Sequence, residues 1–276
     1  TTGLVGSEMC IRDRFNIDGE VKESAHARVN LIGEHTDYTG GYVMPTLLSF
    51  KNTIEISQNN SNEFTVYSQH FKEKKTFNDF KKSINNEWVD YIKGCLHIFF
   101  DENKISSRFL NIFISSDIPL ERGISSSSAL CVATLKALNT FFETKIKDPE
   151  IAKLAKKVEF NYIGVSGGIM DQMVSSIGIH GKAFFMNCKN LEYELINFPE
   201  NWKFCLIDSE VQRNLRDSSY NERFAELQEA EKNLGVEYLG GVKKENFKID
   251  KFENNTIAKR AKHVVFENDR VINAKK

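Results

Sequence analysis

Polar and charged side chains crowd one short segment near the start of the chain, which reads Arg28-Val29-Asn30-Leu31-Ile32-Gly33-Glu34-His35-Thr36-Asp37-Tyr38. Such a set suits a small polyhydroxylated ligand, because each sugar hydroxyl needs a fixed donor or acceptor. A solvated turn with incidental surface charge accounts for the same residues equally well. The segment therefore predicts a sugar site and leaves the surface turn open.

A second segment, residues 117–129, carries a run of serines behind a turn and reads DIPLERGISSSSA. Serines at the start of a helix supply hydroxyls, free backbone N–H groups and the positive end of the helix dipole, which together bind phosphate. The segment is not the GxxxxGK[ST] phosphate loop, since no lysine follows Gly123. Taken alone, a serine-rich helix cap without a ligand is the commoner explanation.

An acidic residue follows two glycines in GGIMDQ, residues 167–172. Glycine permits close backbone approach, and a carboxylate in partly apolar surroundings acts as a base or orients a hydroxyl. A role for Asp171 as a simple helix cap is equally common.

A further carboxylate, Glu159, follows Ala155 by one turn on the helix expected after Pro149. It therefore lies close to the buried stripe of that helix. A glutamate in this position is either a salt-bridge partner or a Mg²⁺ ligand, and its own segment does not decide between them.

Mixed strands and helices must position these segments. β-forming or alternating residues predict strands over 43–44, 53–57, 64–68, 110–115, 182–187 and 204–207. Helical spacing predicts helices over 88–100, from the serine run to Phe142, over 220–234 and over 257–273. Asp148-Pro149-Glu150 predicts a helix start with Asp148 as the N-cap. Residues 243–255 are expected to form a surface connection.

Composition and charge exclude several classes of protein. Among 276 residues, Lys+Arg (37) nearly cancels Asp+Glu (38), which argues against a nucleic-acid or membrane-surface binder. No apolar run approaches the ~18 residues of a membrane span. The five cysteines form no CxxC pair, which is typical of unpaired thiols in a reducing cytoplasm.

Both ends of the chain are unusual. The leader TTGLVGSEMCIRDR, residues 1–14, has neither the layout of a signal peptide nor apolar periodicity, so we expect it to be extraneous to the natural protein. The helical pattern reaches Lys276 without a glycine or proline stop. We therefore expect the natural protein to continue beyond it.

Taken in order, these segments resemble the galactokinase branch of the GHMP small-molecule kinases. RVNLIGEHTDYTGGYVMP (28–45) is similar to the galactokinase signature, which the other branches lack. IPLERGISSSSAL (118–130) resembles the family's ATP-phosphate loop, and GGIMDQ resembles its catalytic-aspartate segment. DSSYNER (217–223) and AKRAKHVVFENDRV (258–271) are also similar to galactokinase segments.

The resemblance implies an α+β fold with two parts. An N-terminal domain similar to domain 2 of ribosomal protein S5 would span residues 15–180, and an incomplete ferredoxin-like domain would span 181–276. The implied reaction is the ATP-dependent phosphorylation of α-D-galactose at its anomeric hydroxyl, giving galactose 1-phosphate and ADP, as in the Leloir pathway. ATP and Mg²⁺ are the implied cofactors of a cytoplasmic monomer with no nucleic-acid or membrane partner.

The resemblance also implies residue roles. Asp171 would be the catalytic base, and Arg28 would stabilise negative charge near it. Sugar contacts would come from Glu34, His35, Thr36, Asp37 and Tyr220. The triphosphate would lie against Glu121, Arg122, Gly123, Ile124, Ser125, Ser126 and Ser127, and Mg²⁺ would be positioned by Ser127 and Glu159.

Two departures from the family pattern bear on activity. Glu121 and Arg122 replace small residues of the phosphate loop, so that bulk restricts backbone approach and an acid faces phosphate unless it points to solvent. Arg122 could compensate by reaching a phosphate oxygen. The family's glycine-rich third motif has no counterpart before Lys276, so we expect weak or no turnover from this chain alone.

Two other functions stay open at this point. The same scaffold could serve as a non-catalytic sensor that binds sugar and ATP and signals to a partner protein. The substrate could also be an N-acetylated or uronic relative of galactose, such as N-acetylgalactosamine, although Glu34 and Asp37 would repel a uronate.

Overall fold

The computed structural model describes residues 20–119, 122–209 and 218–276, and within them eight strands form one sheet. Its central order is β2-β7-β3-β6-β4-β5, with β1 paired to β3 and β8 paired to β7. The strands are β1 (Val21–Asn30), β2 (Tyr42–Val43), β3 (Pro45–Gln58), β4 (Phe64–Ser68), β5 (Glu73–Phe77), β6 (Leu110–Ser116), β7 (Lys182–Asn187) and β8 (Tyr193–Asn197). β4 and β6 run parallel, whereas β1 and β3 run antiparallel.

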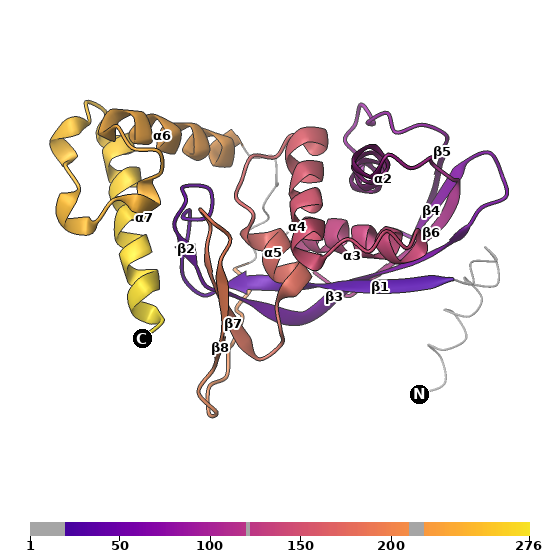
Figure 1. Ribbon diagram of the computed structural model, residues 1–276, viewed down its shortest axis with the longest axis horizontal. Coiled ribbons are helices and arrows are strands. Elements are labelled where there is room, and N and C mark those ends of the chain that lie inside the picture. Colours follow the sequence, from indigo (N-terminus) through magenta and orange to yellow (C-terminus); the bar gives the residue numbers. More distant parts are fainter. Residues whose placement is uncertain (1–19, 120–121, 210–217) are drawn as a thin grey trace.

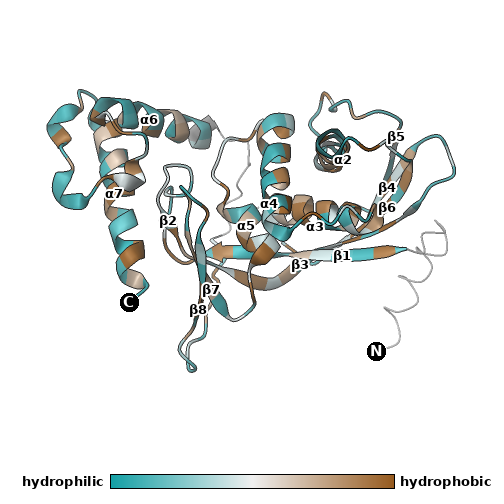
Figure 2. Cartoon of the chain, viewed as in Figure 1, coloured by the Kyte–Doolittle hydropathy of each residue, from teal (hydrophilic) through white to brown (hydrophobic). Residues whose placement is uncertain are grey.

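A group of helices covers one face of β1 and β3 (Figure 1). They are α2 (Val89–Asn103), α3 (Ser126–Phe141), α4 (Asp148–Lys157) and α5 (Met170–Ile177), with a π-helical turn, η1 (Val158–Ile163), following α4. Their apolar stripes pack on the inward residues of the sheet, and the core contains Ile54, Ile112, Leu96, Phe99 and Leu135, all of them fully buried. Figure 2 shows these hydrophobic stripes facing the sheet and hydrophilic residues on the outer turns.

The remaining helices, α6 (Ser218–Leu234) and α7 (Asn255–Ala274), lie beside β2 at the end of the molecule opposite α2 (Figure 1). Three 3₁₀ turns connect them within the described residues, η2 (Leu239–Gly241), η3 (Lys244–Asn246) and η4 (Ile249–Lys251). The two helices share a small apolar cluster that includes Leu227, Ile257 and Val264. Val271 of α7 packs instead with Met44 and Phe185, so α7 is attached to the sheet.

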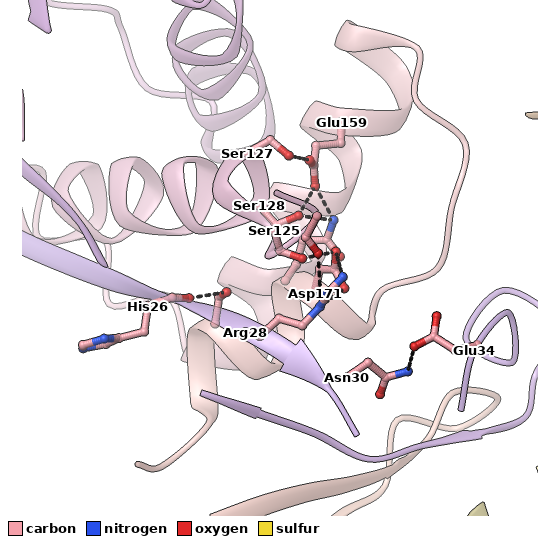
Figure 3. Close-up of polar contacts among 12 residues, drawn as sticks. His26, Arg28, Asn30, Glu34, Ser125, Ser127, Ser128, Glu159 and Asp171 are labelled. Atoms are coloured by element: carbon pink, nitrogen blue, oxygen red, sulfur yellow. Dashed lines mark hydrogen bonds and ion pairs between the residues drawn. The ribbon is translucent and has the colours of Figure 1, made fainter. Parts of the chain in front are cut away.

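A side-chain contact fixes α5 against β1. Ser175 on α5 donates a hydrogen bond to the carbonyl oxygen of His26 at 2.8 Å. Asp171 lies four residues earlier on the same helix, and residues four apart share one helix face. Arg28 lies two residues beyond His26 on β1, past a shift in the β1–β3 register, and its side chain turns toward α5. The packing of α5 on β1 therefore brings Asp171 to Arg28 (Figure 3).

Most of the expected elements are present. The strands expected over 53–57, 64–68, 110–115 and 182–187 lie within β3, β4, β6 and β7, and the expected helices correspond to α2, α3, α4, α6 and α7. The strand expected over 43–44 is displaced by one residue, because Val43 ends β2 and β3 begins at Pro45. β1, β5, β8 and α5 were not expected as elements.

Two local expectations were wrong. Residues 204–207 have no strand partner, and Phe204, Leu206 and Ile207 are 48%, 49% and 88% exposed. An apolar run becomes a strand only where a neighbouring backbone completes its hydrogen bonds, and none does so there within the described residues. Lys147, rather than Asp148, occupies the N-cap of α4, and Asp148 is the first helical residue.

The division of the chain near Gly181 stays a prediction. β7 follows that glycine and pairs with β2 and β3, so the sheet continues across the expected boundary. The leader, residues 1–14, lies outside the described residues. Among the described cysteines, Cys95, Cys131, Cys188 and Cys205 are free, as expected, and no described helix has the length and apolarity to cross a membrane.

Candidate functional site

A two-point ion pair joins β1 to α5 at the centre of the candidate site. Arg28 Nε donates to Asp171 Oδ1 at 2.7 Å, and Arg28 Nη2 donates to Asp171 Oδ2 at 2.8 Å (Figure 3). The β1–β3 register shifts between His26 and Arg28, and such irregularities re-aim the side chains beside them. Burial opposes the charge on Arg28, but the adjacent carboxylate of Asp171 prevails and raises the pKa of the guanidinium. The ion pair therefore fixes the positive charge of Arg28 beside the carboxylate of Asp171.

The start of α3 meets this pair through Ser125. Ser125 Oγ donates to Asp171 Oδ2 at 2.5 Å, and the residue adopts a left-handed backbone, with φ 63°, which is uncommon outside glycine. A carboxylate offers about four lone-pair positions. Arg28 and Ser125 occupy three of them, which leaves one for a further donor such as a sugar hydroxyl.

The predicted phosphate loop is anchored to the same arginine. Arg28 Nη1 donates to the carbonyl oxygen of Gly123 at 3.2 Å, and the backbone N–H of Arg28 donates to that of Ile124 at 3.2 Å. The helical bonding of α3 begins with Ala129 N–H donating to Ser125 O at 3.1 Å, so the preceding N–H groups have no partner inside the helix. The loop thus presents a helix N-terminus beside Asp171.

The two bulky residues of this loop differ in what can be described. Arg122 forms an ion pair with Asp208, with 2.8 Å between Nε and Oδ2, so its side chain is engaged with residues 202–209. Glu121 lies outside the described residues. Ser126 accepts a hydrogen bond at its carbonyl from Asn52 Nδ2 at 3.0 Å, which ties the first turn of α3 to β3.

Glu159 lies buried beneath the first turn of α3. Its carboxylate accepts from Ser127 Oγ at 2.7 Å, from Ser128 Oγ at 2.8 Å and from Gln172 Nε2 (Figure 3). Burial raises the pKa of Glu159, and these three hydrogen bonds oppose that rise. A buried carboxylate adjoining a helix N-terminus is a place where a cation would relieve the desolvation cost.

The oxygen atoms around Glu159 fit a hard cation. Gln172 Oε1 is buried and has no hydrogen-bond partner within the part of the chain that the structure describes, and it lies on the side chain that contacts Glu159. Mg²⁺ takes oxygen ligands and is usually bound by one or two carboxylates together with substrate phosphates. Ser127, Glu159 and Gln172 supply that donor set. No cluster of three His, Cys, Asp or Glu side chains suited to a metal occurs among the described residues.

The predicted sugar loop packs on the segment that leads into α5. Gly168 packs directly on Asp37, because a Cβ atom at position 168 would overlap the Asp37 carboxylate. His35 Nδ1 lies 2.7 Å from Tyr38 Oη, and its ring centroid lies 5.9 Å from that of Tyr220. Asp37, His35 and Tyr220 are therefore brought together from the loop and from α6.

Two other residues of the loop lie differently. Glu34 is exposed and accepts from Asn30 Nδ2 at 3.0 Å. Thr36 is fully buried, and its hydroxyl donates to Gly33 O at 2.8 Å and to Tyr42 O at 2.6 Å. The geometry therefore gives Thr36 a role in the shape of the loop rather than the sugar contact expected from the sequence.

Asp37 has the clearest electrostatic signature of the loop. Burial and the charge of Asp171 raise the pKa of Asp37 to about 6, whereas Lys156 and Arg28 oppose the rise. Burial and the charge of Asp37 also raise the pKa of Tyr220. The loop therefore carries a carboxylate that titrates near neutrality, which is typical of binding and catalytic sites.

Lys156 is a site residue that the sequence reasoning missed. Its Nζ donates to the carbonyl oxygen of Gly167, and burial lowers its pKa against the opposing charges of Asp37, Glu159 and Asp171. Lys156 precedes Glu159 by three residues, and such neighbours share a helix face. That spacing was the available signal, but a lysine on a helix is usually solvated.

Substitution of Gly168 by alanine tests the contact between the two segments. The new Cβ would overlap Asp37, so we expect sugar affinity to fall by about tenfold or more, because misplacement of about 1 Å at a reacting group costs up to about a hundredfold. Gly241→Ala is the matched control, since nothing lies within 4 Å of a Cβ there. Titration calorimetry with galactose measures both variants, and equal affinity in Gly168→Ala would contradict the placement of Asp37.

Comparisons with known proteins identify relatives of this chain. The sequence matches the GHMP kinases N terminal domain over residues 90–178 and the galactokinase galactose-binding signature over residues 12–58. The galactokinase of Thermotoga petrophila is 36% identical over 253 residues, covering 91% of this chain and 70% of that protein. The galactokinase of Mannheimia succiniciproducens is 30% identical over 269 residues, covering 95% and 70%.

A solved structure extends the likeness to three dimensions. The crystal structure of Lactococcus lactis galactokinase complexed with galactose has a TM-score of 0.88 and 30% sequence identity to this chain. The match covers 99% of this chain and 74% of that one.

Proposed function

The chain belongs to the galactokinase family, and we propose on this basis that it transfers the γ-phosphate of ATP to the anomeric hydroxyl of α-D-galactose. The products are galactose 1-phosphate and ADP. One observation supports this function above the others. The Arg28–Asp171 pair lies between the N-terminus of α3 and the loop that carries Asp37, so a sugar hydroxyl and a phosphate group can meet at one carboxylate.

The sugar side of the reaction rests on fixed acceptors. Asp37 accepts hydrogen bonds from ring hydroxyls, and His35 accepts from them or donates to them. Glu34 bonds a hydroxyl at the exposed edge of the site, and the ring of Tyr220 lies against one face of the sugar. The free lone-pair position of Asp171 accepts the proton of the anomeric hydroxyl and aims its oxygen at the phosphate. Because three donors already stabilise this carboxylate, orientation contributes more than basicity.

The phosphate side rests on charge neutralisation. Phosphoryl transfer proceeds through a loose transition state that needs positioning and countercharge rather than covalent chemistry. The backbone N–H groups of residues 123–127 cradle the phosphates, with Ser125 and Ser126 at the start of α3, and Arg28 neutralises charge beside Asp171. Ser127 and Glu159 would hold Mg²⁺, together with Gln172. When bound, Mg²⁺ supplies positive charge to the phosphate oxygens.

A coupled assay of ADP release tests this function directly. We expect galactose to be phosphorylated faster than N-acetylgalactosamine, and galacturonate to be a poor substrate because its carboxylate faces Glu34 and Asp37. Sugar and nucleotide binding without ADP release from any of the three would favour a sensor instead. Binding is measured alongside by calorimetry, so that a chain with weak turnover is distinguished from one that does not recognise the sugar.

The pH dependence of galactose binding follows from Asp37. Its pKa is about 6, so an ionised acceptor is lost as the pH falls below that value. We expect affinity at pH 5 to be about tenfold weaker than at pH 8, since a pH one unit below a pKa leaves roughly a tenth of the group ionised. Calorimetry across pH 5–8 measures this, with Asp37→Asn as the variant in which the acid limb disappears.

The raised pKa of Asp37 has the opposite effect on the pH dependence of folding stability. A carboxyl pKa raised from 3.8 to about 6 in the folded state means that the unfolded state loses this proton first, so stability falls as the pH rises through that interval. Asp37→Asn removes the penalty. At pH 8 we expect the variant to melt a few degrees higher while binding galactose less well, and a lower melting temperature would contradict the assignment.

A further inference from the structure

Helix α7 holds the backbone of the sugar loop, although more than 220 residues separate the two in sequence. Its residues His263, Glu267 and Asn268 contact this loop; Glu267 lies four positions after His263, and Asn268 follows it directly. Glu267 Oε1 accepts from the backbone N–H groups of Gly33 at 2.8 Å and Glu34 at 3.2 Å. His263 Nε2 lies 3.1 Å from the carbonyl oxygen of Glu34. Each contact is made to backbone, so α7 acts on the path of the loop.

The carboxylate of Glu267 is fully engaged. Its second oxygen, Oε2, accepts from Arg270 Nε at 2.8 Å and Nη2 at 2.6 Å. With the Gly33 and Glu34 bonds, all of its roughly four lone-pair positions are used. The side chain is 9% exposed. Burial would raise the pKa of Glu267, but the four hydrogen bonds prevail and hold it below its ordinary value, so the group stays ionised and keeps accepting.

Asn268 fixes the other end of the same loop. Its Oδ1 accepts from the backbone N–H of Tyr42 at 2.7 Å, and its Nδ2 donates to Gly240 O at 3.0 Å. A Cβ atom at Gly41 would lie 2.8 Å from Asn268 Oδ1, so the side chain packs tightly on the loop. Glu267 and Asn268, which are consecutive residues of α7, therefore bind the loop backbone at its entry and at its exit.

Contacts within the loop itself stabilise the segment between Gly33 and Tyr42. Thr36 joins the carbonyl oxygens of Gly33 and Tyr42 through its hydroxyl. His35 adopts a left-handed backbone, with φ 65°, a conformation that persists only where the surroundings fix it. Small shifts at Gly33 or Tyr42 would therefore be passed on to His35 and Asp37.

We propose that Glu267 and Asn268 are positioning residues for sugar recognition, which set the path of residues 33–42 and so the places of Glu34, His35 and Asp37. The inference rests on the proposed function for its sugar, and on the backbone contacts of Glu267 and Asn268 for its mechanism. It gives a role to the segment AKRAKHVVFENDRV, to which the sequence assigned none. Both residues act through the backbone of the loop.

Substitution of Glu267 by alanine removes the oxygen that accepts both backbone hydrogen bonds at the loop entry. We expect the dissociation constant for galactose to rise by about tenfold to a hundredfold, because buried hydrogen bonds to charged groups are among the stronger ones. Affinity for MgATP should stay within about twofold. Glu267→Gln keeps an oxygen for the Gly33 and Glu34 donors and should recover most of the sugar affinity. Asp269→Asn, a neutralised neighbour whose carboxylate bonds only to the helix residue Asn273 among the described residues, is the matched control.

Backbone amide exchange provides a second readout that needs no ligand. The Gly33 and Glu34 amides should exchange about tenfold faster in Glu267→Ala than in the unsubstituted chain, while Asp269→Asn leaves them unchanged. If Glu267→Ala does not fold, Asn268→Ala tests the same inference at Tyr42, since it leaves the Glu267–Arg270 ion pair intact. It should weaken galactose binding in the same direction and speed exchange of the Tyr42 amide.

The outcomes separate this inference from the proposed function. Weaker galactose binding together with faster loop exchange in a folded variant supports it. Galactose binding and loop exchange both within twofold of the unsubstituted chain would overturn it. If the unsubstituted chain does not bind galactose at all, the proposed function fails, and the exchange of Gly33, Glu34 and Tyr42 alone decides whether α7 holds the loop.

Discussion

Replacement of Asp171 by asparagine is expected to lower kcat by about 10²- to 10⁴-fold, the usual contribution of a positioned acid or base. The asparagine amide cannot take the proton of the anomeric hydroxyl. Its NH₂ group would also face a donor, either Arg28 or Ser125, both of which now donate to the carboxylate. The loss should appear mainly in kcat, because Asp37 and His35 still bind the sugar. Coupled ADP release measures kcat, and calorimetry measures the affinity for galactose.

The matched control for this variant is Asp101→Asn. That carboxylate lies near the end of α2, is 64% exposed and pairs only with Lys104 among the described residues. Surface pairs of this kind contribute little, so its kcat should be unchanged. Undiminished turnover in Asp171→Asn would remove Asp171 from the reaction.

Substitution of Glu159 by glutamine is expected to raise the Mg²⁺ concentration for half-maximal activity by about tenfold or more, since ligands and their partners commonly contribute 10- to 100-fold in metal affinity. The neutral side chain keeps an oxygen for Ser127 or Ser128 but loses the charge. Because burial raises the pKa of Glu159, neutralisation also removes a desolvation cost. The variant should therefore melt at the same temperature or higher.

Glu150→Gln supplies the comparison on the same stretch of helix. Glu150 lies in the first turn of α4, and its side chain is 54% exposed and paired with Lys153. Neutralisation of Glu150 should leave the Mg²⁺ concentration for half-maximal activity unchanged. An unaltered requirement in Glu159→Gln, measured by Mg²⁺ titration of ADP release, would contradict the role of Glu159, whereas a drop in melting temperature would contradict the electrostatic reasoning.

Much of the site could be predicted because its chemistry is local in sequence. The α+β GHMP kinase fold expected from the motifs is confirmed by the likeness to the Lactococcus lactis galactokinase structure. Glu34, His35 and Asp37 lie within four positions, and the serines follow one another at a helix start. Their residue types favoured hydroxyl and phosphate binding, while the segments alone left a surface turn and a plain helix cap open. The apolar periods of α2, α3 and α7 likewise fix their buried faces.

The remainder depends on contacts that sequence patterns do not contain. β1 was missed because its end carries the polar residues Arg28 and Asn30. These residues interrupt the alternation of apolar and polar side chains by which a strand is predicted. Residues 204–207 have the composition of a strand, but none of the described backbone pairs with them. Lys156 and Glu267 carry no distinctive motif of their own, and only the packing of α4 and α7 brings them to Gly167 and Gly33.

Residue choice within the phosphate loop illustrates the same limit. The sequence left Arg122 free to reach a phosphate oxygen, but the structure pairs it with Asp208. Ser125 was expected to contact phosphate, whereas its hydroxyl donates to Asp171. In both cases the partner lies more than 40 residues away along the chain, so the competing contact could not be weighed from the segment itself.

The central claim is that one carboxylate, held by Arg28 and Ser125, receives the sugar next to the start of α3. A crystal structure with galactose, Mg²⁺ and a non-hydrolysable ATP analogue tests it most directly. We predict the anomeric oxygen about 2.6–3.2 Å from an Asp171 carboxylate oxygen, with the terminal phosphate against the first turn of α3. A hexose bound with that oxygen turned away from Asp171, or a nucleotide bound away from α3, would contradict the account.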